Sequence, residues 1–155
     1  MKKAKVFKMI FYLIGILVLI IVVQMFVKNS IVPSNIGVIK GELAPLPKTP
    51  NCVSSFAIDM DKYVEPLPFV GDFEESKEKL LRVMKEYGTM SVVTEEGNYM
   101  HIVFTTGKMK FNDDVELLFD LTLNKIYYRS ASRVGYGDMG LNKERYASIK
   151  KEYLD

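Results

Sequence analysis

The chain has 155 residues, of which 48% are hydrophobic, and a formal net charge of +2 at pH 7. This length suits one domain, since single cores of about 100–150 residues are the common size. All 19 acidic residues lie after Lys28, so the part beyond it has 16 basic residues against 19 acidic ones, a charge of −3. Nucleic acid is a poor partner for such a domain, because it requires a basic face.

The first element of the chain is an uncharged segment, Met9 to Val27. As a helix it spans roughly 28 Å, which matches the hydrocarbon core of a bilayer. The segment exceeds the apolar region of a signal peptide, no small-residue cleavage site follows it, and it lacks the polar face of a buried helix. Anchoring through a lipid on Cys52 is rejected, because this cysteine lies far beyond the segment. We predict an uncleaved anchor in residues 1–28 that contacts the bilayer through residues 9–27.

The orientation of this anchor follows from the basic residues around it. Four lysines precede the segment and Lys28 alone follows immediately; the four are Lys2, Lys3, Lys5 and Lys8. Lys and Arg are retained on the cytoplasmic side. We therefore expect a single-pass protein of the cell membrane, with its N-terminus in the cytoplasm and its C-terminal domain outside.

Residues 29–51 contain four prolines and two glycines. This composition resists helix formation and favours extended chain. We interpret residues 29–41 as a tether and place the start of the exported domain near residue 42, so that the domain covers residues 42–155.

Helical periodicity occurs twice within the domain. Asp72 and Glu75 form a capping-box pattern at the start of a helix that ends before Gly88. After Gly140, Asn142 is a candidate N-cap of a terminal helix. The apolar residues on one face of these helices are Leu80, Leu81, Met84 and Tyr87 in the first, and Tyr146, Ile149 and Tyr153 in the second.

Alternating apolar and polar residues predict four antiparallel strands, at residues 91–95, 99–106, 115–121 and 125–133. A two-residue turn at Leu123-Asn124 would pair Val115 with Ser132. One face of this hairpin would then be apolar, and the other would carry Asp114, Glu116, Asp120, Lys125, Arg129 and Arg133. We expect an α+β domain in which an antiparallel sheet of about four strands is covered on one face by two helices.

Three stretches resemble the family called domain of unknown function 1499: LAPLPKTPNCVSS at residues 43–55, DDVE at 113–116 and RSASRVGYGDMGLN at 129–142. The resemblance runs from about residue 41 to 150. It implies membership of a family with no assigned activity. Its members often have a second cysteine where Leu46 stands and a histidine near Lys62, so neither a shared disulfide nor a mechanism that needs two histidines is expected here.

The best candidate for an anion site is Arg133 with the loop Gly135-Tyr136-Gly137, where glycines let backbone N–H groups turn towards an anion. Arg129 lies four residues earlier on the same strand face, roughly 13 Å away. Alternatively, Arg133 pairs with Asp114 across the hairpin and Arg129 pairs with Glu116 diagonally.

Further polar residues could line a pocket or only satisfy backbone groups in a turn, namely Asn51, Ser54 and Ser55. Cys52, His101 and either Asp113 or Asp114 have the residue types of a nucleophile, a base and an orienting acid, but their spacing does not show that they meet. A lone cysteine or histidine more often has a structural role. No pair of His or Cys has metal-ligand spacing.

We therefore expect a non-enzymatic extracytoplasmic module, without cofactor or metal, that binds an anionic or amphiphilic ligand or an envelope protein. The alternative is a hydrolase or transferase with Cys52 or Ser54 as nucleophile and His101 as base.

Overall fold

The computed structural model describes residues 2–155, with side chains from Lys5 onward. It divides into a first unit that ends at Ile31 and a second unit, Val32–Asp155, here called the α+β unit. The first unit is one helix, α1 (Lys2–Ser30). Its stretch Lys5–Ser30 is long and apolar enough to cross a membrane, by length and composition.

The α+β unit contains a six-stranded antiparallel sheet with the order β3-β8-β7-β6-β5, in which β4 also pairs with β8. A separate hairpin is formed by β1 and β2. The strands are β1 (Val38–Ile39), β2 (Glu42–Leu43), β3 (Cys52–Ser54), β4 (Leu67–Pro68), β5 (Met90–Glu96), β6 (Tyr99–Thr105), β7 (Asn112–Asp120) and β8 (Lys125–Ser132).

The expectation of about four strands was wrong, because the described residues form eight strands in two sheets. The four expected strands are β5 to β8. The four additional ones, β1 to β4, have only two or three residues each. Such short strands contain too few residues to show an alternating pattern, so hydrophobic periodicity does not detect them.

The predicted register of the β7–β8 hairpin was also wrong, by two residues. Val115 pairs with Ser130 rather than with Ser132. The turn has four residues rather than two, because the Asp120 carboxylate accepts hydrogen bonds from the N–H groups of Thr122 and Leu123 at 2.9 Å each. A two-residue shift keeps every side chain on its predicted face, so the division into an apolar and a charged face is confirmed.

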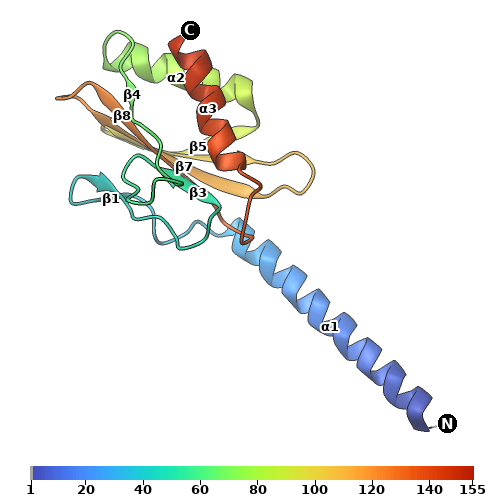
Figure 1. Cartoon of the computed structure of the whole chain (residues 1–155). Coiled ribbons are helices and arrows are strands. Elements are labelled where there is room, and N and C mark those ends of the chain that lie inside the picture. Colours follow the sequence, from blue (N-terminus) through green and yellow to red (C-terminus); the bar gives the residue numbers. More distant parts are fainter. Residues whose placement is uncertain (1) are drawn as a thin grey trace. The chain divides into compact units, whose positions relative to one another are not determined.

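Two helices, α2 (Phe73–Tyr87) and α3 (Leu141–Leu154), cover the apolar face (Figure 1). The capping box at the start of α2 is confirmed, since Asp72 accepts from the Glu75 N–H and Glu75 accepts from the Asp72 N–H. The helices and the sheet share a core that includes Leu80, Met84, Ile102, Val115, Leu117, Phe119, Ile126, Tyr128, Ile149 and Tyr153.

Asn142 is not the N-cap of α3, because the helix begins one residue earlier and the N-cap is Gly140. The Asp138 carboxylate accepts from the N–H groups of Gly140 and Asn142, at 3.1 and 2.8 Å. Asn142 thus lies inside the helix, and its buried side chain is available for contacts with the sheet.

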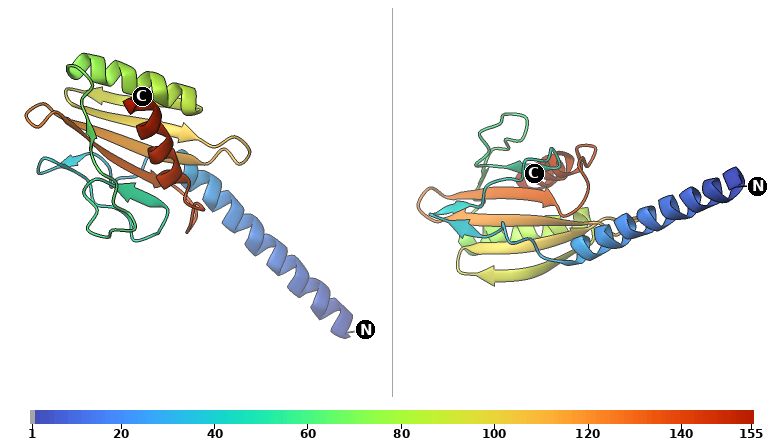
Figure 2. Two further views of the ribbon diagram at one scale, coloured as in Figure 1. Left: turned by 45° about the horizontal axis from the view of Figure 1, so that its top comes forward. Right: turned by 90° about the horizontal axis from the view of Figure 1, so that it is seen from below.

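The charged face of the sheet is covered by residues 33–50, here called the covering segment. Its β1–β2 hairpin lies against β7 and β8 (Figure 2). The Gly37 N–H donates to Glu116, and Arg129 donates to the carbonyl of Asn35 at 3.1 Å. The residues interpreted as a tether therefore include ten that belong to the α+β unit, which begins at Val32.

We expect Asp72→Ala to lower the free energy of unfolding by about 1 kcal/mol, because the first turn of α2 loses its capping acceptor. Urea unfolding of the full chain in detergent, followed by circular dichroism, measures this effect. Glu78→Ala is the matched control, since Glu78 is an exposed carboxylate in the middle of the same helix. Equal losses in the two variants would contradict the capping role.

Candidate functional site

The charged face of the sheet carries a polar layer of six side chains: Tyr99, His101, Asp114, Glu116, Arg129 and Arg133. They come from β6, β7, β8 and the residue that follows β8. All are buried except Tyr99, which is half-buried. Charges so far from water are stable only when they are paired and hydrogen-bonded, so the partners of this layer decide whether it can bind anything.

Asp114 lies at the centre of one half of the polar layer. Its Oδ1 is 2.7 Å from both His101 Nε2 and Arg133 Nη2, and its Oδ2 accepts from Arg133 Nε at 2.9 Å. Burial by itself would raise the pKa of the Asp114 carboxyl, but the hydrogen bonds from His101 and Arg133 outweigh it and hold this pKa below its usual range. The pairing of Arg133 with Asp114, expected as the alternative to an anion site, is confirmed.

Glu116 is the centre of the other half. One carboxylate oxygen accepts from Arg129 Nη1, and the other accepts from the Tyr99 hydroxyl at 2.9 Å and the Gly37 N–H at 2.5 Å. Arg129 lies directly opposite Glu116 rather than diagonally. Burial and the nearby Glu116 carboxylate raise the pKa of Tyr99, so this hydroxyl remains a donor.

The loop after Arg133 does not share an open site with the guanidinium. The Arg133 side chain is 4% exposed and lies in the polar layer. The carbonyls of Val134 and Gly135 accept from the Asn51 side-chain amide, at 3.4 and 3.0 Å. Tyr136 extends into solvent, and Gly137 lines a separate cavity of about 320 Å³.

The predicted polar residues on β3 and beside it have local partners. Besides the contacts of Asn51, the Ser54 hydroxyl accepts from the Phe56 N–H and the Ser55 hydroxyl accepts from the Tyr128 N–H, both at 3.1 Å. These contacts hold the chain against β8 as it leaves β3. They account for both serines without a ligand.

Sequence reasoning missed a second buried network beneath the N-terminus of α3. Arg145 donates to Asp113, to Asn142 at 2.8 Å and to Ser130 at 3.1 Å. Asn142 in turn donates to the backbone carbonyl of Asn51 at 3.1 Å. The spacing of residues in the sequence could have predicted that Arg145 is buried. It precedes Ile149 by four residues and therefore lies on the same, buried face of the helix.

Cys52 and His101 do not form a catalytic pair. They lie on the same face of the sheet but three strands apart, a separation of about 14 Å. The buried Cys52 thiol donates to the Thr49 carbonyl at 3.1 Å, and burial raises its pKa. A buried, protonated thiol that donates to a backbone carbonyl is not an activated nucleophile.

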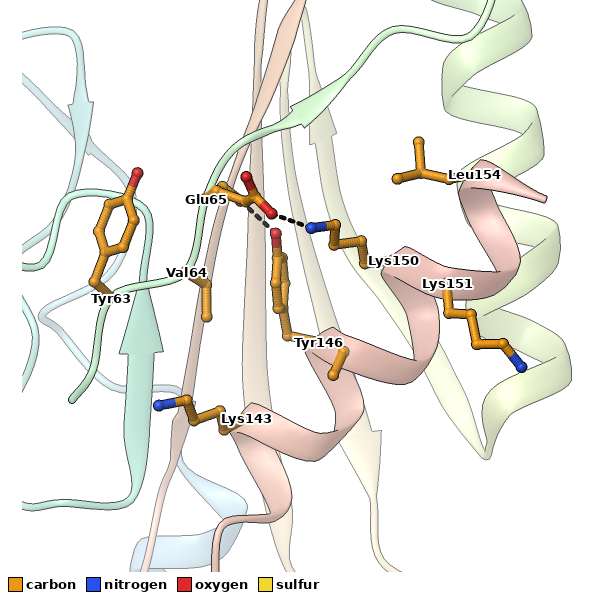
Figure 3. A pocket seen from close by; sticks show the side chains of 9 residues that line it. Tyr63, Val64, Glu65, Lys143, Tyr146, Lys150, Lys151 and Leu154 are labelled. Carbon is orange, nitrogen blue, oxygen red and sulfur yellow. Dashed lines mark hydrogen bonds and ion pairs between the residues drawn. The ribbon is translucent and has the colours of Figure 1, made fainter. Parts of the chain in front are cut away.

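A groove of about 580 Å³ lies between α3 and residues 63–65 (Figure 3). Lys143, Tyr146 and Lys150 of α3 point towards this segment, and Lys150 is paired with Glu65. Tyr146 donates to the Glu65 carbonyl, which fixes one wall. The full lining is Tyr63, Val64, Glu65, Lys143, Tyr146, Ala147, Lys150, Lys151 and Leu154.

These features define a chain with one helix able to cross a membrane and one α+β domain with a lysine-bordered groove. The chain belongs to the family described as protein of unknown function (DUF1499), whose model matches residues 42–152. The resemblance seen in the sequence is thus confirmed. No curated protein and no solved structure matches the chain.

We expect Arg133→Ala to lower the free energy of unfolding by about 3–5 kcal/mol, because it leaves the buried Asp114 carboxylate without its main cation. Urea unfolding of the full chain in detergent gives this value. Arg82→Ala is the matched control, since Arg82 is exposed on α2, and we expect a change within about 0.5 kcal/mol there. A stable Arg133→Ala protein would show that Arg133 is not a structural residue.

Proposed function

We propose that the protein is a membrane-anchored, extracytoplasmic binding module for an anionic amphiphile, held in the groove between α3 and residues 63–65. The observation that carries this proposal is the combination of an apolar lining and a lysine border in one hollow. A volume of about 580 Å³ lies within the range of roughly 300–1,000 Å³ that is usual for small-molecule sites.

The charges around the groove favour an anion. Three lysines and one glutamate line it, which leaves a net charge of +2 within a unit that is acidic as a whole. Lys143 and Lys151 are exposed, so their ammonium groups are available to a ligand without loss of a buried partner. An acidic head group would gain charge-assisted contacts at this border.

The lining between these charges favours an alkyl chain. Val64, Ala147 and Leu154 supply aliphatic surface, and Tyr63 and Tyr146 supply the faces of their rings. Tyr146 is buried, with a ring centroid 5.1 Å from that of Tyr128, so this wall is fixed by the core. A fatty acid or a lysophospholipid, with one chain and one negative head group, has the required chemistry.

The proposed compartment rests on α1 and on the lysines before it. A helix able to cross the membrane, with four lysines ahead of it, favours a cytoplasmic N-terminus. Alkaline phosphatase fused to Asp155 should therefore be active, because this enzyme works only outside the cytoplasm. Green fluorescent protein fused to the same residue should not fluoresce, because it would be exported unfolded. The reverse pattern would overturn the orientation.

A photo-crosslinking experiment tests the ligand. We expect diazirine-labelled palmitate, added to the full chain in nanodiscs, to label residues of α3 and 63–65 more strongly than its methyl ester does. Lys143→Gln should reduce labelling by about tenfold, because one charge-assisted contact contributes about 1.5 kcal/mol. Lys150→Gln should reduce it less, since Lys150 is already paired with Glu65. Labelled peptides are mapped by mass spectrometry.

Lys125→Gln is the control for this experiment, since Lys125 is exposed at the start of β8 and outside the groove. Equal labelling in all three variants, or equal labelling by acid and ester, would contradict an anion-binding groove.

A further inference from the structure

The most exposed large apolar side chains of the α+β unit gather on two loops. Met139 is 105% exposed, Ile58 99%, Tyr136 78% and Met60 76%, whereas no other large apolar side chain described in this unit exceeds 57%. Residues 56–61 connect β3 to the strand-like segment before β4, and residues 134–140 connect β8 to α3. We call these two loops the apolar loop tips.

The two loops are neighbours in the fold, although about eighty residues separate them in the chain. Asp61 of the first loop and Met139 of the second line the same cavity of about 320 Å³. Lys143, just inside α3, donates to the carbonyl of Asp61 at 3.1 Å. The two loops therefore lie side by side and form one region of the surface.

A bilayer is the surface that fits this region. Each of the four apolar side chains stands beside a Gly or Asp residue on a loop, so it can enter the head-group region without burying a regular element. Tyr is enriched at membrane interfaces, and Met adapts to irregular apolar surroundings. The α+β unit begins at Val32, two residues after α1 ends, so a membrane crossed by α1 is within immediate reach.

The loop tips also adjoin the groove. Lys143 lines both the groove and the cavity between the loops, and so joins the two hollows. We propose that the apolar loop tips dock on the bilayer that holds α1, so that the groove receives its amphiphile directly from that bilayer. This inference rests on the proposed function, because it requires α1 to cross a membrane and the groove to take a lipid-like ligand.

Tryptophan fluorescence tests the docking without background, since the chain has no tryptophan. Met139→Trp and Ile58→Trp are prepared in the full chain and placed in nanodiscs of phosphatidylcholine and phosphatidylglycerol. An indole about 5–10 Å deep in the interface should lose roughly half of its emission when the lipids carry bromine near the head group. Its emission should also be shifted to the blue relative to that of the same variant in small detergent micelles, which offer the loops no bilayer surface.

Leu123→Trp is the control, because the exposed Leu123 lies in the β7–β8 turn, at the end of the hairpin opposite to the 134–140 loop. Its emission should remain unquenched. Equal quenching at all three positions, or none at residues 58 and 139, would overturn the docking. Tyr136→Trp replaces either variant that fails to give the circular dichroism of the parent protein.

Palmitate crosslinking of a Met139→Asp/Ile58→Asp variant, with Tyr136→Trp added as the fluorescent reporter, separates this inference from the proposed function. We expect this labelling from nanodisc lipid to fall severalfold. Lys150→Gln, which changes the groove but not the loops, should leave the quenching at residues 58 and 139 unchanged. If quenching is lost in this variant but labelling of the groove is unchanged, the amphiphile does not reach the groove through the docked loops. That result would overturn the inference and leave the proposed function intact. Quenching at residues 58 and 139 without any groove labelling would retire the groove as the destination of the amphiphile and thus overturn the inference.

Discussion

The fold depends on the neutralisation of Asp114 and Glu116 inside the molecule. Two carboxylates project from adjacent positions on one face of β7. Glu116 is paired with Arg129, which lies directly opposite on β8, and Asp114 is paired with Arg133, the residue that follows β8. Buried charges of this kind are stable only when they are paired and all their hydrogen bonds are made, and the sheet alone does not provide all of these bonds. Tyr99, His101 and the backbone of the covering segment supply the remaining hydrogen bonds. The sheet therefore requires a cover on its charged face as much as it requires helices on its apolar face.

The sequence motifs that identify the family are mainly concerned with this architecture. Asn51 holds the loop after β8, Ser55 holds β8 itself, and Asn142 ties α3 to the backbone at Asn51. Arg129 and Arg133 are committed to buried carboxylates. In this chain, these residues of the family pattern are therefore engaged in buried structural contacts.

Periodicity and capping chemistry were sufficient for α2, for the four long strands and for the division of β7 and β8 into two faces. They failed where the deciding interaction was not local. The turn of the β7–β8 hairpin depends on the Asp120 side chain, and the start of α3 depends on Asp138 because Asn142 is used by the sheet. Arg133 and Gly137 are near in sequence, yet the Arg133 side chain is buried against Asp114, whereas Gly137 lines a separate cavity. The groove was not visible in the sequence, because Val64 and Tyr146 are brought together only by packing of the long connection before β4 on α3.

The covering segment also affects where the domain can be cut. The family match starts at residue 42, but Asn35 and Gly37 already hold Arg129 and Glu116. A fragment that starts at residue 42 would retain every residue of the shared pattern and yet expose half of a buried charge cluster to water. The start of the family match and the start of the compact unit are thus ten residues apart, and a recombinant fragment of the α+β unit should begin at Val32.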